Sequence, residues 1–152
     1  MIEFKSIRIL DSSKNVVTHV HSGDEIIISF SFRSIRRIED PTFGILIRNR
    51  YGVSIFGTNT YLLQQKNNPL LPGEMYQVCY RLKVPLQPDD YLITVAIDNK
   101  GKATNSFDEY ILRLNDIATL KVVRNENQPP YDGITNLNPA IHVETYTMEY
   151  PE

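Results

Sequence analysis

Apolar and polar residues alternate along most of the chain, which is typical of β-strands that bury one face. The clearest case is residues 25–33, in which Ile26, Ile28, Phe30 and Phe32 would share one face. Three later segments alternate in the same way. Their inward rows are Phe43, Ile45 and Ile47, then Tyr76, Val78, Tyr80, Leu82 and Val84, then Tyr91, Ile93, Val95 and Ile97. We expect these rows to form a hydrophobic core.

The remaining segments add further short extended elements. We expect strands at residues 2–10, 53–60 and 118–123, a short strand at 16–20, a last extended segment at 141–148, and a short strand or a helical turn at 108–114. Residues 34–41 and 64–74 read as loops, and Asn99-Lys100-Gly101 reads as a turn. No segment has the period of a long amphipathic helix. Many short strands with turns between them predict an all-β sandwich.

Composition is consistent with one globular domain over residues 1–152. The chain is 41% hydrophobic and 22% charged, and its net charge is −2, which gives no electrostatic signal for nucleic acid or an anionic membrane. Cys79 is the single cysteine and cannot form an internal disulfide. No secretory signal opens the chain and no apolar run is long enough to span a bilayer. The simplest compartment is therefore the cytoplasm.

One pattern could carry metal chemistry. His19, His21 and Glu25 have the spacing HxHx3E, as in cupins, and two histidines at i and i+2 of a strand point the same way. The glycines and the later histidine of the cupin pattern are absent, which favours two surface histidines over a metal-dependent cupin-like enzyme. Nothing else indicates catalysis: residues 52–58 (GVSIFGT) lack the lysine of a phosphate-binding loop, and Cys79 has no activating neighbour in sequence. We expect no catalytic residue, metal or cofactor.

Four segments carry a resemblance to a known family. They are Ser22-Gly23-Asp24-Glu25 with the strand that follows, PTFGILIRN with Tyr51-Gly52 and IFGTNT, Leu71-Pro72-Gly73-Glu74 before the strand at 76–84, and residues 90–97 (DYLITVAI). The stretch FGILIRN…YG…IFGTNT is the most specific. In these segments the chain resembles the C-terminal carbohydrate-binding domain of Wzt, the nucleotide-binding subunit of bacterial O-antigen polysaccharide ABC transporters.

The resemblance implies a fold, a role and partners. It implies an immunoglobulin-like antiparallel β-sandwich that follows an ATPase domain, so that this chain would be a fragment of a longer transporter subunit without ATPase activity of its own. Such a domain recognises the modified non-reducing terminus of a completed O-antigen polysaccharide, and this couples the glycan to export. The implied place is the cytoplasmic face of the bacterial inner membrane, beside the membrane permease. The identity of the terminal sugar does not transfer between members.

The resemblance also implies a homodimer in which the last strand crosses to the partner. Residues 140–150, extended and preceded by a proline-stiffened loop, could be that strand, or they could form an edge strand of their own chain. A rival interpretation of the whole chain is a non-catalytic β-sandwich that binds another protein through its sheet edge.

The outward rows of the strands supply the candidate sugar-binding residues. By strand phase, Arg48, Thr94, Ala96 and Asp98 face away from the core, Arg81 and Ser31 could lie on either exposed face, and Tyr51 is free to be exposed. Thr94 and Ala96 are small enough to leave room for a sugar ring. Arg48 and Asp98 could form charge-assisted hydrogen bonds with hydroxyls or an anionic cap. The alternative for this face is a solvated surface with a salt bridge.

Overall fold

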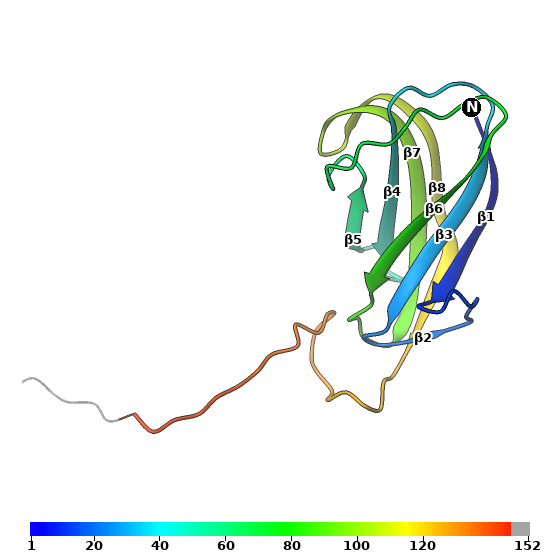
Figure 1. The fold of residues 1–152 in the computed structure, drawn as a ribbon. Coiled ribbons are helices and arrows are strands. Elements are labelled where there is room, and N and C mark those ends of the chain that lie inside the picture. The colour runs from blue at the N-terminus through cyan, green and yellow to red at the C-terminus, as the bar shows by residue number, and fades with distance from the viewer. Residues whose placement is uncertain (147–152) are drawn as a thin grey trace, which may run out of the picture.

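The computed structural model describes residues 1–146, and the chain folds into two β-sheets packed face to face (Figure 1). The strands are β1 (Ile2–Asp11), β2 (Val20–His21), β3 (Glu25–Ser34), β4 (Pro41–Arg48), β5 (Ser54–Asn59), β6 (Met75–Lys83), β7 (Asp89–Ala103) and β8 (Ser106–Val123). One sheet has the order β1-β3-β6 and the other has the order β2-β8-β7-β4-β5. Among the residues described, no helix is long and apolar enough to cross a membrane.

The inward rows predicted from the alternation form the core. Ile26, Ile28, Phe30 and Phe32 of β3 are at most 1% exposed, and they face Ile93, Val95 and Ile97 of β7, which are fully buried. Phe32 lies at the centre of an aromatic cluster, with ring centroids 5.8 Å from Phe43 and 5.7 Å from Tyr76. The all-β sandwich predicted from the sequence is confirmed, and all strand pairs are antiparallel except the short β2–β8 pair.

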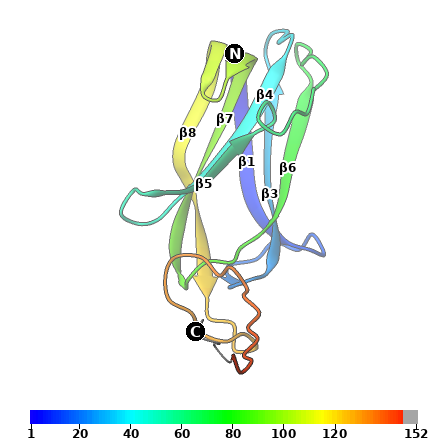
Figure 2. The same cartoon turned by 90° about the vertical axis from the view of Figure 1, so that its left-hand side faces the viewer.

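Two local predictions were wrong, and the segment left open between a short strand and a helical turn is a strand. Asn99-Lys100-Gly101 is not a turn: β7 continues to Ala103 and the chain reverses at Thr104-Asn105, which makes β7 and β8 a long hairpin (Figure 2). Residues 108–114 belong to the same strand as 118–123, because the residues between them form a bulge within β8 and do not end the strand. The short strand near residue 16 is reduced to one bridge between Leu10 and Val16, with β2 beginning at Val20.

The hairpin extends past its turn-forming residues because other segments pair with it. Asn99 is buried, its side-chain oxygen accepts a hydrogen bond from the Asp40 backbone N–H at 2.9 Å, and its partner across the ladder is Glu109. Glu109 in turn forms an ion pair with Arg36. These long-range contacts keep Lys100 within the strand although its φ is 58°. A positive φ and the sequence Asn99-Lys100-Gly101 are both typical of a turn.

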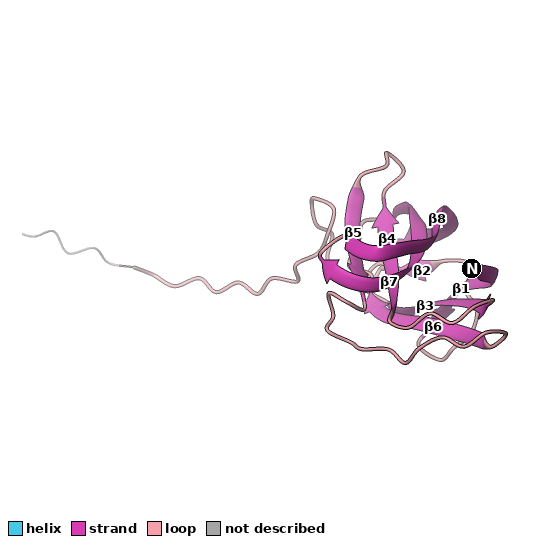
Figure 3. Cartoon of the chain, turned by 90° about the horizontal axis from the view of Figure 1, so that it is seen from above, coloured by secondary structure: helices cyan, strands magenta, loops and turns pink. Residues whose placement is uncertain are grey.

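The segment after β8 leaves the sandwich. A bridge between Leu86 and Thr135 ties it to the body, after which the chain extends away (Figure 3). Residues 140–146 form no strand, and Ile141, Val143 and Tyr146 are more than 80% exposed. Residues 147–150 of the predicted exchanged strand lie outside the described residues.

Phe32→Ala should destabilise the fold by about 3–5 kcal/mol, because it removes a fully buried ring from the aromatic cluster. Urea denaturation of the wild type and the variant measures this loss. Ile35→Ala, which truncates a side chain that is 51% exposed, is the control and should change the free energy of unfolding by less than about 1 kcal/mol. Equal losses in the two variants would contradict the assignment of the core.

Candidate functional site: a groove on the outer face of the larger sheet

A groove of about 680 Å³ lies on the face of the β2-β8-β7-β4-β5 sheet that points away from the core. Its lining combines strand residues with the tip of the β7–β8 hairpin: Gly44, Ile45, Leu46, Ser54, Gly57, Thr58, Asn59, Leu62, Thr94, Ala96, Asp98, Thr104, Asn105, Phe107, Tyr110, Ile111, Leu112 and Arg113. Three of the predicted site residues, Thr94, Ala96 and Asp98, are among them. We call this surface the sheet groove.

Small side chains on neighbouring strands create the hollow. The ladder places Gly44 of β4 beside Ala96 of β7, and Leu46 of β4 between Thr94 of β7 and Gly57 of β5. A Cβ atom at Gly57 would lie 2.9 Å from Cδ1 of Leu46, so the Leu46 side chain occupies the space that a larger residue at position 57 would need. The cross-strand register therefore gathers small residues around Leu46, and this leaves a hollow on the outer face of the sheet.

Aromatic and amide side chains form the rim of the sheet groove. Phe107 and Tyr110 meet edge to face, with ring centroids 5.7 Å apart, and Tyr110 donates a hydrogen bond from its hydroxyl to the Asn105 carbonyl at 3.0 Å. Tyr110 is still 67% exposed, so its ring is open to a ligand. Tyrosine offers both an apolar face and a polar tip, a combination suited to a sugar.

Asp98 is the buried carboxyl of the sheet groove, with 8% of its surface exposed. Burial raises its pKa to about 6, while the Arg113 guanidinium and the Ile111 backbone N–H, which donates to the carboxylate, act in the opposite direction. The Ile111 N–H is available because the ladder skips one residue here, pairing Ile97 with Leu112 but Asp98 with Tyr110. The carboxylate is thus a strong hydrogen-bond acceptor held within the groove.

Arg48 does not line the sheet groove, although it lies on the same face of β4. Its Nη2 donates to the Asn115 side-chain oxygen at 3.3 Å, and its Nε lies 3.8 Å from a carboxylate oxygen of Asp116. Asn115 and Asp116 belong to the bulge in β8. The Asp116 backbone N–H donates a hydrogen bond to Thr94 Oγ1 at 3.0 Å, which connects the bulge to β7. The charge of Arg48 is therefore engaged at the bulge.

The other predicted residues lie elsewhere. Arg81 and Ser31 are on the outer face of the opposite sheet, where Arg81 pairs with Glu25 at 2.6 Å and Ser31 hydrogen-bonds Ser6 at 2.9 Å. Tyr51 is 75% exposed in the turn between β4 and β5, with the Arg50 guanidinium 5.1 Å from its ring centroid. The structure does not bring these three residues together with Thr94, Ala96 and Asp98.

The sequence profile of the Wzt C-terminal domain matches residues 1–137. The chain belongs to this family. Membership confirms the resemblance and supports the coarse role it implied, a carbohydrate-binding domain of an O-antigen ABC transporter.

One solved structure agrees with the Wzt assignment at the level of the fold. The crystal structure of the C-terminal domain of Wzt superposes with a TM-score of 0.83 and 18% identity, covering 94% of this chain and 84% of that chain. The CARDB domain of the PF1109 protein from Pyrococcus furiosus, solved with di-metal ions, has a TM-score of 0.47 and 12% identity over 81% of this chain and 88% of that chain. No curated protein matched the chain.

The histidine pattern of this Wzt domain lies apart from the groove. The rings of His19 and His21 meet edge to face at 5.7 Å, His21 Nδ1 lies 3.5 Å from a carboxylate oxygen of Asp24, and Glu25 pairs with Arg81. Among residues 1–146, no group of three or more His, Cys, Asp or Glu side chains is arranged to hold a metal ion.

Most residues on the rim of the sheet groove were not predicted from the sequence. Tyr110 and Arg113 come from residues 108–114, for which a short strand or a helical turn was expected, and Phe107 directly precedes them. Asn59 is the last residue of β5, and Leu62 lies in the loop that follows. A signal was present in the outward glycines, since Gly44 and Gly57 stand in strands where glycine usually weakens packing. Such positions indicate a close approach of backbone or ligand.

Asp98→Asn should change how stability depends on pH. Because the native pKa lies above the unfolded one, the native state binds more protons between about pH 4 and 6, and the wild type loses stability as pH rises through this window. The neutral variant lacks this loss, so at pH 7.5 it should be more stable than the wild type by roughly 1–3 kcal/mol, with convergence near pH 4. Urea unfolding from pH 4 to 8 measures both profiles.

The exposed Asp90→Asn variant is the control and should follow the wild-type profile. Parallel profiles for the wild type and Asp98→Asn would show that Asp98 is not held in a desolvated position.

Proposed function

We propose that this chain binds the modified non-reducing terminus of a completed O-antigen polysaccharide in the sheet groove, and that this binding couples the glycan to export. One observation carries the proposal: a hollow floored by Gly44, Ala96 and Thr94 holds a buried carboxylate and is bordered by an exposed tyrosine. Sugar sites combine these elements, since ring faces pack on aromatic or small apolar surfaces and hydroxyls donate to a charged acceptor. Membership in the Wzt family supports the choice of ligand.

Within the groove, Asp98 is the proposed acceptor for sugar hydroxyls. Thr94 and Ala96 form the floor beneath the ring, and Tyr110 is the proposed stacking surface. Arg48 has a supporting role, because its contacts with Asn115 and Asp116 fix the bulge next to Thr94. Arg81, Ser31 and Tyr51 have no part in this site.

The transporter setting is part of the same proposal. The ATPase would reside in a separate N-terminal domain, with the membrane permease as a further partner. The assembly would lie at the cytoplasmic face of the inner membrane. The domain itself would then bind the glycan terminus without catalysing a reaction.

A homodimer by strand exchange is also proposed. An apolar cleft of about 500 Å³ lies between the edge strands β5 and β6 and is lined by Ile47, Val53, Ile55, Phe56, Leu82, Val84, Leu86 and Ile134, among others. Ile141 and Val143 of the extended segment remain exposed on the single chain. Pairing of residues 140–150 with the partner would cover apolar surface on both sides.

Ala96→Phe should abolish glycan binding without unfolding the domain, because the ring would fill the hollow beside Gly44. Calorimetric titration with O-polysaccharide from the bacterium that encodes the chain, with and without its terminal modification, measures the effect. The wild type should bind only the modified glycan, with a dissociation constant of roughly micromolar to millimolar. Cys79→Phe, on an exposed position of the opposite sheet, is the matched control and should bind as the wild type does. Binding that survives Ala96→Phe would contradict the site.

Removal of residues 139–152 should convert the dimer to a monomer, because the exchanged strand would be lost. Light scattering coupled to gel filtration measures the mass of both proteins. A dimer that persists after truncation, or a wild type that is monomeric at high micromolar concentration, would contradict strand exchange.

A further inference from the structure

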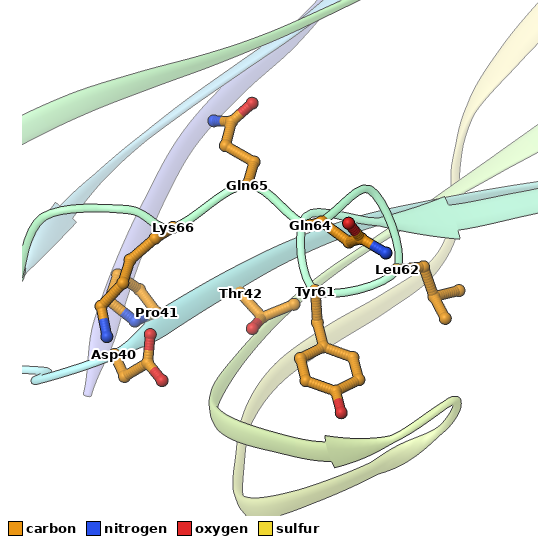
Figure 4. A pocket seen from close by; sticks show the side chains of 8 residues that line it. All are labelled: Asp40, Pro41, Thr42, Tyr61, Leu62, Gln64, Gln65 and Lys66. Atoms are coloured by element: carbon orange, nitrogen blue, oxygen red, sulfur yellow. The ribbon is translucent and has the colours of Figure 1, made fainter.

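A second hollow of about 460 Å³ adjoins the sheet groove at the end where β4 begins. It is lined by Asp40, Pro41, Thr42, Tyr61, Leu62, Gln64, Gln65 and Lys66 (Figure 4). Leu62 lines both this hollow and the sheet groove, so the two hollows adjoin at Leu62. We call the second hollow the loop pocket.

The loop that makes the loop pocket is fixed by its own hydrogen bonds. The Asn59 side-chain oxygen accepts from the Leu62 N–H at 2.8 Å, and the Thr60 carbonyl accepts from the Gln65 N–H at 2.9 Å. The Asn67 amide then donates to both the Thr60 hydroxyl and the Pro41 carbonyl, each at 3.0 Å. Because these bonds order the loop before a ligand arrives, binding there would lose little conformational entropy.

Tyr61 gives the loop pocket a flat apolar surface. Its ring packs against the backbone of Gly101 in β7 so closely that a Cβ atom there would lie 2.4 Å from ring carbon Cδ2. Even so, 38% of Tyr61 is exposed, and Figure 4 shows its ring on the side of the loop that faces the β7–β8 hairpin. A ring held by the backbone on one side and open on the other can stack on a sugar.

The polar side chains of the loop pocket suit an uncharged polyol. Gln64 and Gln65 bring amides, which both donate and accept, and the charges of Asp40 and Lys66 offset each other. Within residues 1–146, the Gln64 amide and the Lys66 ammonium form no side-chain hydrogen bond, so both are available to a ligand. A polyanion would find one cation and one carboxylate here, which gives it no net attraction.

We propose that the loop pocket is a second sugar subsite, occupied by inner residues of the same glycan whose terminal residue lies in the sheet groove. This inference rests on the proposed function. Because the two hollows adjoin at Leu62, the glycan would run from the terminal sugar over Ala96, past Leu62, to an inner sugar against Tyr61. The domain would therefore bind a short oligosaccharide and not only a single terminal sugar.

The test compares glycan length. Oligosaccharides of one, two and four sugars that retain the modified non-reducing end, prepared by partial hydrolysis of the O-polysaccharide of the encoding bacterium, are titrated into the full chain by calorimetry. The wild type should bind the tetrasaccharide about tenfold more tightly than the monosaccharide, the gain expected for one further stacked sugar. Tyr61→Ala should remove this gain while leaving the affinity for the monosaccharide unchanged.

A second variant and a control keep the result specific to the loop pocket. Gly101→Ala retains the Tyr61 side chain but must displace its ring, so it should also lose the length-dependent gain. Tyr51→Ala removes an exposed tyrosine outside both hollows and should retain the gain.

Two results would overturn the second subsite while the sheet groove stands: equal wild-type affinity for all three lengths, or a gain that persists in both Tyr61→Ala and Gly101→Ala. Failure of the wild type to bind any of the three oligosaccharides would overturn the proposed function and the second subsite together.

Discussion

Burial of alternate side chains between the two sheets is the interaction on which the rest of the structure depends. The row Ile26, Ile28, Phe30 and Phe32 packs against Ile93, Val95 and Ile97, and this contact excludes water from the centre of the sandwich. Because successive residues of a strand point to opposite faces, fixing one row inward commits the other row to the outer surface. The outward positions of Thr94, Ala96 and Asp98 follow directly from the inward positions of their neighbours.

Strand pairing then converts outward residues into a shaped surface. Gly44, Gly57, Thr94 and Ala96 are distant in sequence, but the ladders of β4, β5 and β7 place them side by side. The β7–β8 hairpin and the loop after β5 rise on either side of this patch and carry Tyr110 and Leu62. A rigid sheet thus supplies the floor, and the loops supply the walls, which is a common arrangement for binding sites.

The alternation of apolar and polar residues was enough to predict the features that depend only on which face of a strand a residue occupies. It predicted the sandwich, the inward rows and three residues of the sheet groove. It could not predict what depends on register between distant strands. Arg48 contacts Asn115 and Asp116 of the β8 bulge and does not line the groove. The sequence around Arg48 contains nothing that predicts this contact. Asn99-Lys100-Gly101 has the composition of a turn, yet pairing with Glu109 and a contact from Asp40 keep it in a strand.

The central claim is that the terminal sugar lies over the small-residue floor of the larger sheet. A crystal structure of the chain soaked with the tetrasaccharide of the O-polysaccharide of its bacterium tests this claim most directly. The account predicts a sugar ring above Ala96 and Thr94, with a hydroxyl within hydrogen-bond distance of the Asp98 carboxylate. A sugar bound instead to the outer face of the β1-β3-β6 sheet, with the sheet groove empty, would contradict it.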